Sequence, residues 1–564
     1  MLSLGVVLST FVVASVTIFI THWVRKWRNP KCENGVLPPG SMGLPLIGET
    51  IQLLIPSRSL ELHPFISKRV QRYGPVFRTN IVGKPVVVTT DPKFNHYILT
   101  EEGKSVELWY LDTFTTMLPI YAVGNVQKYI RNTTLSRFGV EGIRVNLLSQ
   151  VEQVIQTTLR HWSTNQIVDV KHEAACMIFD FTLKQLISYD WEKSSEKPLS
   201  KRFSSLLHGL LCLPLDIPGT TFHQIVKDRK EMLSIMRDAI VERMNFPNKI
   251  QMDFLDTVME DLKTQKFVTP EFLSNFMFGI LFANFEPVTS VILLSLKLLS
   301  EHPSSLEELT AENEAIIRNK KNPDSLLSWE EYKSMTFTLN VVNEILRLGN
   351  IAPGLLRKVT KDIKFNGYTV PVGWAIMIVT SAHQLNPEAF KNPVEFNPSH
   401  DIVLVDETRE GVNTKLEIWR KALESKGFWI SRTKTEYMKC KFSNSNNESR
   451  GEVKIENQEL PKSEHFRYLG SIITTAGEID ADVAHRIKTK SDLDPTVISK
   501  NFMPFGGGIR QCAGADYARA FACTFLHVLV TKYSWTKVKG GNISRRPVLD
   551  FVDGLHIKIT EKSN

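Results

Sequence analysis

Cysteine is scarce in this chain of 564 residues: there are only six, and none form a CxxC pair. A chain this long with so few, scattered cysteines is not a disulfide scaffold, and a reducing compartment is favoured. The balance of charge is also modest. A formal net charge of +8 does not indicate nucleic-acid binding, although it would suit a protein that rests on an anionic membrane surface.

Charge is absent from the first 20 residues, and the apolar run continues to about Val24 before Arg25, Lys26 and Arg28. This run is long enough to cross a bilayer, and the basic residues after it place the rest of the chain in the cytosol. A cleaved signal peptide is the alternative, but no basic residues precede the run. We predict a transmembrane anchor over residues 1–24 and a basic, proline-rich linker over residues 25–48.

The most informative segment is FGGGIRQCAG, which runs from Phe505 to Gly514. Its glycines, Gly508 among them, allow the backbone angles and close approach that a cysteine ligand to a flat macrocycle requires. Cys512 would supply a thiolate to a haem iron, and such a ligand favours O–O cleavage. Arg510 can pair with a haem carboxylate, and Phe505 can shield the sulfur from water. A glycine-rich turn around a buried cysteine is the alternative.

This segment resembles the cysteine-ligand loop of the cytochrome P-450 monooxygenases, and the run ADYARAFACTFLHVLVTKY after it matches the helix beneath the haem in that family. The resemblance implies a mainly α fold with small β-sheets. It also implies haem b (iron protoporphyrin IX) as cofactor, with Cys512 as the axial ligand of the iron. The other cofactor-binding residues implied in this loop are Phe505, Gly508, Arg510 and Gly514.

Two further motifs support the resemblance. Glu344 and Arg347 stand at i and i+3 on one helix face and match the structural ExxR pair of the family, with Arg357 in the place of a propionate-binding arginine. Arg131, in VQKYIRN, matches another such arginine, although Gln127 replaces the usual Trp or His. An ordinary surface pair and a solvated basic helix face are the alternatives.

The apolar helix FGILFANFEPVTS is interrupted by Glu286. A carboxylate in such a stretch is costly unless it is paired or solvated. In the family an acid–alcohol pair lies here, over the iron, and delivers protons to bound oxygen. Pro287 follows the acid, so Thr289 is the nearest hydroxyl along the chain. We therefore expect Glu286 and Thr289 to be the catalytic residues and Pro287 to kink the helix.

Residues 401–490 do not continue the family pattern. His400 stands where the family has an arginine, and we expect its loss to leave the Glu344–Arg347 pair incompletely satisfied. The block resembles part of the reverse transcriptases encoded by plant LINE-type retrotransposons. Those enzymes bind catalytic metals through adjacent aspartates, of which only Asp401 is present, so we expect no polymerase activity. An unusually long natural loop is the alternative.

The remaining pattern predicts a β-hairpin over residues 73–92, helices over most of residues 93–350 and strands over residues 363–380. The predicted catalytic domain is therefore mainly α. It has a first part over residues 49–400, a small α/β insertion of reverse-transcriptase type over residues 401–490, and a second part over residues 491–564.

The resemblance implies a haem-dependent monooxygenase that hydroxylates a lipophilic molecule. Several stretches are most similar to plant enzymes that oxidise sterols, brassinosteroids and triterpenoids. The expected partners are O2, an NADPH-cytochrome reductase, the substrate and the endoplasmic reticulum membrane, with the catalytic domain cytosolic and no nucleic acid. A haem-free, non-catalytic chimera is the second interpretation. A nucleic-acid-binding remnant of a reverse transcriptase is a third.

Overall fold

The computed structural model describes most of the chain between residues 4 and 562. The residues outside the description are 1–3, 31, 46, 111–114, 116–123, 190–198, 204–205, 207–214, 249, 323, 353, 388–389, 391, 399–408, 425–436, 438–452, 456–457, 464, 469–470, 475–501, 547 and 563–564. His400 and Asp401, on which predictions about the inserted block depend, lie outside the described residues.

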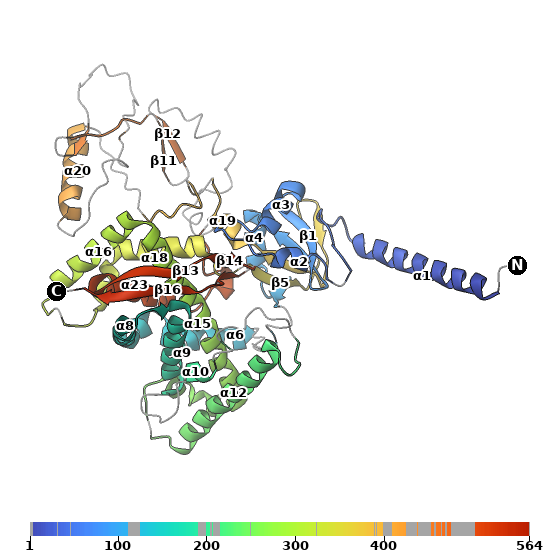
Figure 1. Cartoon of the computed structure of the whole chain (residues 1–564), viewed down its shortest axis with the longest axis horizontal. Helices are drawn as coiled ribbons and strands as arrows, with labels where there is room; N and C mark the ends of the chain where they lie inside the picture. The colour runs from blue at the N-terminus through green and yellow to red at the C-terminus, as the bar shows by residue number, and fades with distance from the viewer. Residues whose placement is uncertain are drawn as a thin grey trace.

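The body of the protein is mainly helical (Figure 1), as the sequence predicts. Its long helices are α6 (Gly124–Phe138), α8 (Leu148–Thr164), α9 (Val170–Ile187), α12 (Thr221–Asn245), α15 (Pro270–Glu301), α16 (Pro303–Arg318), α18 (Thr336–Gly349) and α23 (Ala515–Lys532). The shorter helices of the body are α2 (Thr50–Leu54), α3 (Pro64–Tyr73), α4 (Pro92–Thr100), α7 (Val140–Gly142), α10 (Leu199–Arg202), α13 (Phe254–Val258), α14 (Asp261–Thr264), α17 (Trp329–Ser334) and α19 (Thr380–Gln384).

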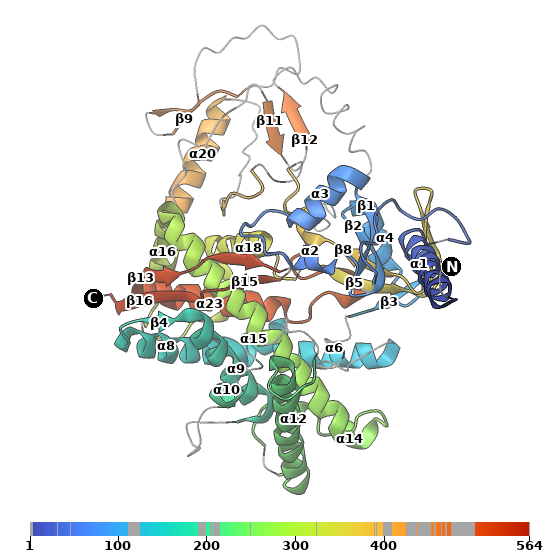
Figure 2. The same ribbon diagram turned by 45° about the vertical axis from the view of Figure 1, so that its right-hand side comes forward.

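Helix α15 runs through the middle of this body and packs against α9, α12, α18 and α23 (Figure 2). Its start is fixed by Thr269, whose side chain accepts a hydrogen bond from the N–H of Phe272, and by Pro270 in the first turn. The helix then continues without a break through Pro287. Because most of its side chains are buried, packing offsets the backbone hydrogen bond that Pro287 removes.

A five-stranded sheet forms a second layer beside the helices. Its order is β1-β2-β8-β5-β3, with β2 and β8 parallel and the other neighbours antiparallel. Val82 and Gly83 connect β1 to β2 with φ values of 52° and 76°, so the predicted hairpin is confirmed. These strands are β1 (Val76–Ile81), β2 (Lys84–Thr89), β3 (Val106–Leu108), β5 (Leu355–Val359) and β8 (Ala375–Ile378).

Smaller sheets complete the body. The C-terminal strands pair as β13-β16-β4 and β14-β15, and β6 pairs with β7 in the region predicted to be strand. Their bounds are β4 (Val168–Asp169), β6 (Ile363–Phe365), β7 (Tyr368–Val370), β13 (Tyr533–Gly540), β14 (Ile543–Arg545), β15 (Leu549–Phe551) and β16 (Leu555–Glu561).

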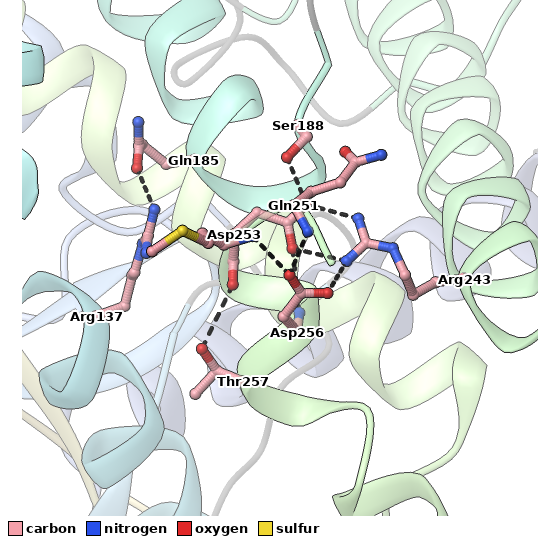
Figure 3. Close-up of polar contacts among 9 residues, drawn as sticks. Arg137, Gln185, Ser188, Arg243, Gln251, Asp253, Asp256 and Thr257 are labelled. Carbon is pink, nitrogen blue, oxygen red and sulfur yellow. Dashed lines mark hydrogen bonds and ion pairs between the residues drawn. The ribbon is translucent and has the colours of Figure 1, made fainter. Parts of the chain in front are cut away.

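A buried ionic cluster joins three helix ends far from the Cys512 loop in sequence (Figure 3). Arg243, near the end of α12, donates to Asp253 at 2.8 Å and contacts Asp256 in α13. Asp253 also accepts from Ser188, which caps α9, at 2.7 Å. Arg243 and Asp253 are almost completely buried, so their pairing is needed to avoid isolated buried charges. The cluster fixes the turn between α12 and α13 against α9.

Helix α1 (Leu4–Arg28) projects from the body in Figure 1 and ends in three basic residues. Its described side chains from Phe11 to Thr21 are exposed. Among the described residues, the helix that is long and apolar enough to cross a membrane is α15, and 67% of its most apolar stretch is buried inside the protein. Core helices of soluble proteins share that property, so the anchor over residues 1–24 stays a prediction.

The described part of the 401–490 block contains one helix and two pairs of short strands, on the side of the body where α16 and α18 lie (Figure 2). These elements are α20 (Arg409–Glu424), β9 (Lys454–Ile455), β10 (Gln458–Glu459), β11 (His465–Tyr468) and β12 (Ser471–Thr474). Leu416, Val453 and Leu460 form a small apolar cluster that is separate from the main core. The block therefore has a packing centre of its own.

Candidate active site

The loop that carries Cys512 is a tight turn directly before α23. Backbone hydrogen bonds join the N–H of Cys512 to the carbonyl of Phe505 at 3.0 Å and the N–H of Ala518 to the carbonyl of Gly514 at 2.9 Å. Gly508 has a φ of 67°, and a Cβ there would lie 2.9 Å from the carbonyl oxygen of Leu99. The loop therefore requires glycine at Gly508 for both its conformation and its close contact with α4.

Cys512 is a free cysteine with an exposed side chain, although many protein atoms surround it. Partial burial raises the pKa of the Cys512 thiol, whereas the Gly514 N–H and the charges of Arg131 and Arg519 oppose that rise. A metal cation at the sulfur would take the place of the proton, and the neighbouring donors would then stabilise the thiolate. Phe505 lies beside the loop, with the Arg519 guanidinium 4.7 Å from its ring centroid.

Helix α6 holds the loop from one side. Arg131 donates to the carbonyl of Gln511, and Gln127 donates to the carbonyl of Ile509 at 3.0 Å. Arg131 therefore lies beside the Cys512 loop and contacts its main chain, and its role toward a haem carboxylate stays a prediction. The amide of Gln127 provides a second link of the same kind.

Arg357 and Arg510 come together on the other side of the loop around one carboxylate, that of Glu102. Arg510 Nε lies 3.1 Å from Glu102 Oε1, and Arg357 Nε contacts Glu102 Oε2. Tyr110 shares this environment: burial raises the pKa of its phenol, and the charges of Arg357 and Arg510 oppose the rise. The sequence analysis missed both Glu102 and Tyr110, because nothing in their local spacing marks them.

The middle of α15 presents an accessible apolar strip. Ala283 is exposed and Ile280 and Pro287 are partly exposed, whereas most of the helix around them is buried. Positions i, i+3 and i+7 fall on one face at 3.6 residues per turn, so these three side chains share a surface. An apolar molecule can contact α15 along this strip without displacing core side chains.

Glu286 is partly exposed and lies three residues after Ala283, whereas Thr289 is buried. Glu286 and Thr289 line a small cavity with Lys171 of α9 and Asp550 of β15, which themselves form an ion pair at 2.5 Å. Burial raises the pKa of Glu286 to about 7; Lys171 opposes this shift and Asp550 adds to it. The Thr289 hydroxyl donates to the carbonyl of Phe285 in the preceding turn. Both residues therefore border one cavity on the α9 side of α15, and their catalytic roles stay a prediction.

Glu344 and Arg347 form a well-satisfied pair on α18. Arg347 donates to both oxygens of Glu344, at 2.7 and 2.8 Å. Its remaining N–H groups donate to the carbonyls of Gln384, Pro393 and Glu395, and Glu344 accepts from the N–H of Asn397 at 3.0 Å. The expectation of an incomplete network is wrong, because main-chain groups of residues 384–397 supply the partners.

The residues around Cys512 fit a haem group. The sulfur is accessible, and two arginines that could bind the carboxylates of the group lie close together beside the loop. The donor set of one thiolate and several guanidiniums suits an iron porphyrin. Within the described residues, no cluster of three or more His, Cys, Asp or Glu side chains could hold a metal ion directly.

Comparison with known proteins also indicates a haem-binding protein. The cytochrome P-450 family profile matches residues 38–400. Beta-amyrin 16-alpha-hydroxylase CYP87D16 of Maesa lanceolata is 42% identical over 557 residues, covering 98% of each chain. Cucurbitadienol 11-hydroxylase of Siraitia grosvenorii is 41% identical over 561 residues, covering 98% of this chain and 99% of that protein.

The fold agrees as well. The solved structure of retinoic acid bound cyanobacterial CYP120A1 superposes with a TM-score of 0.67 at 20% identity, covering 94% of this chain and 100% of that one. This likeness supports the fold alone, while the family profile and the two plant relatives establish membership. The chain therefore belongs to the cytochrome P-450 family and is a haem-thiolate monooxygenase.

Proposed function

We propose that this enzyme hydroxylates a triterpenoid or related sterol-like molecule. The observation that carries the proposal is the near full-length similarity to two plant hydroxylases whose names give beta-amyrin and cucurbitadienol as substrates. The apolar strip of α15 formed by Ile280, Ala283 and Pro287 suits such a lipophilic skeleton.

In this proposal Cys512 would bind the haem iron, and Arg131, Arg357 and Arg510 would bind or orient the carboxylates of the haem. When bound, haem supplies the reductive activation of O2 that leads to C–H hydroxylation. Glu286 acts as a proton reservoir beside the accessible strip of α15, because a pKa of about 7 lets its carboxyl both hold and release a proton near neutral pH. Thr289 lines the same cavity with its hydroxyl held on the carbonyl of Phe285.

We also propose that α1 anchors the enzyme in the endoplasmic reticulum membrane, with the catalytic domain in the cytosol and an NADPH-cytochrome reductase as electron donor. The exposed apolar side chains of α1 and its basic end, Arg25, Lys26 and Arg28, support this arrangement. Members of the family in general use a redox partner, O2 and a lipophilic substrate.

For the block at residues 401–490, we propose an insertion of reverse-transcriptase origin that divides the catalytic domain into residues 49–400 and 491–564. Two observations support an insertion: the family profile match ends at residue 400, and Leu416, Val453 and Leu460 pack in a separate cluster. Incorporation of nucleotides in a primer-extension assay with Mg²⁺ would contradict the view that the block has no polymerase activity.

The full-length chain expressed in yeast microsomes with a plant reductase tests the main proposal. We expect a reduced, carbon-monoxide-bound spectrum of thiolate type, and a hydroxylated product by mass spectrometry when beta-amyrin or cucurbitadienol is supplied. Cys512→Ala is the negative control. A normal spectrum with no product from either compound would refute the substrate class, whereas a wild-type chain without haem would support the haem-free chimera instead.

A further inference from the structure

Glu102 occupies an unusual position, between two cationic side chains next to the Cys512 loop. The Glu102 side chain is 3% exposed, and those of Arg357 and Arg510 are 3% and 14% exposed. The fold brings the three groups together from sites far apart in sequence. Glu102 lies in the turn after α4, Arg357 lies on β5, and Arg510 ends the short 3-10 turn Gly508–Arg510.

The backbone fixes the position of Glu102 closely. The N–H of Gly103 donates to the carbonyl of Val106 at 2.8 Å, which closes the turn between α4 and β3. Strand β3 then pairs with β5, where Leu108 lies opposite Arg357. The carboxylate is therefore held by the same sheet that holds one of its two partners, so its distance from Arg357 is set by strand pairing.

One carboxylate between two guanidiniums solves an electrostatic problem. Two buried arginines side by side would repel each other and would each lose solvation. Glu102 offsets one of the two positive charges, which allows both arginines to remain buried and leaves one net positive charge for an anionic ligand. Without Glu102, we expect the Arg357 and Arg510 side chains to separate or to become hydrated.

The contacts of Glu102 also decide which edge of each guanidinium stays available. Both contacts are made by Nε atoms, and Arg357 Nη1 donates to the carbonyl of Leu356 at 2.9 Å. Among the described residues, Arg357 Nη2 and the two Nη atoms of Arg510 have no hydrogen-bond partner. These are the donors that match a carboxylate in the paired geometry that guanidinium favours.

We propose that Glu102 is a positioning residue for the cofactor: it holds Arg357 and Arg510 by their Nε atoms so that their Nη donors bind the haem carboxylates together. The proposal rests on Cys512 as the haem ligand. It predicts that removal of the Glu102 charge weakens haem binding. A carboxylate that merely competes with haem for the two arginines would have the opposite effect, because its removal would strengthen binding.

The test compares the full-length wild-type chain with Glu102→Gln, Glu102→Asp and a matched control, Glu101→Gln. Glu101 is the adjacent carboxylate, and its partners are Ser105 and Lys104 instead of the two arginines. The rate of haem loss is measured by transfer to excess apomyoglobin, and the thiolate spectrum and the thermal unfolding of each variant are recorded in parallel.

We expect Glu102→Gln to lose haem about tenfold faster than wild type, as for the loss of one charge-assisted interaction. Glu102→Asp keeps the charge on a shorter side chain, so its rate of haem loss should lie between those of wild type and Glu102→Gln. The rate for Glu101→Gln should equal that of wild type. Equal or slower haem loss in Glu102→Gln would overturn the proposal. If Glu102→Gln fails to fold, Glu102→Asp decides: haem loss no faster than in Glu101→Gln would overturn it. A wild-type chain that binds no haem would instead refute the role of Cys512.

Discussion

The burial of Glu286 predicts how the free energy of unfolding depends on pH. Glu286 lies beside the Lys171–Asp550 ion pair, and burial raises the pKa of its carboxyl from 4.5 to about 7 in the folded protein. Lys171 lowers that pKa but does not outweigh burial, and Asp550 raises it further. The folded state therefore prefers the neutral carboxyl, and it becomes less stable once the group is forced to ionise.

Proton linkage gives the direction and the size of this pH effect on stability. Between pH 4.5 and about 7 the folded chain binds the Glu286 proton more tightly than the unfolded chain, so the free energy of unfolding falls as pH rises through this window. At ~1.36 kcal/mol per pKa unit, the full effect is about 3 kcal/mol. Gln has nearly the shape of the neutral carboxyl and does not titrate. The stability of Glu286→Gln relative to wild type should therefore increase by about 3 kcal/mol between pH 4 and pH 8.

Urea unfolding of both proteins at several pH values between 4 and 8 measures this difference, since a change in the midpoint at constant slope reports a change in stability. Glu271→Gln is the matched control, because it removes an exposed carboxylate from the first turn of the same helix. Wild-type and Glu286→Gln profiles that run parallel across the whole pH range would refute the reasoning, whatever their absolute separation.

Three other changes have expected outcomes. Cys512→Ser should abolish the thiolate spectrum and leave the far-ultraviolet circular dichroism unchanged; an unaltered spectrum would exclude Cys512 as the ligand. Arg347→Lys should lower the free energy of unfolding by about 3 kcal/mol in urea titrations, because lysine cannot replace the fork that serves Glu344 and several carbonyls; a loss below about 1 kcal/mol would contradict the buried network. Replacing residues 401–490 by a short loop should preserve or increase the haem content per chain by absorbance, and a decrease would show that the block is integral.

Local pattern was sufficient for the elements that define the family. The Cys512 loop, the helix after it and the 73–92 hairpin could be predicted because turns, helical periods and strand periods are properties of neighbouring residues. The Glu344–Arg347 pair could be predicted for the same reason, since residues three apart are neighbours on the same face of a helix. Its main-chain partners could not, because they come from residues 384–397 and depend on how that segment folds back.

The same limit explains why Glu102 was missed. Its partners, Arg357 and Arg510, are 255 and 408 positions away in the chain, and strand pairing and helix packing bring them together. A glutamate in the turn after a short helix carries no local sign of such a role. Only the three-dimensional arrangement shows that one carboxylate is shared by two buried cations.

The position of Pro287 links these observations to the chemistry of α15. Proline has no N–H, so the carbonyl of Ala283 lacks its usual intrahelical donor. Ala283 is exposed on the same strip as Pro287, whereas the Thr289 hydroxyl already donates to the carbonyl of Phe285 on another face. The helix therefore has one carbonyl without its i+4 donor next to its exposed apolar strip. Glu286, which lines the cavity with Lys171, lies three residues further along the same helix, so the free carbonyl and the titratable carboxyl are neighbours on α15.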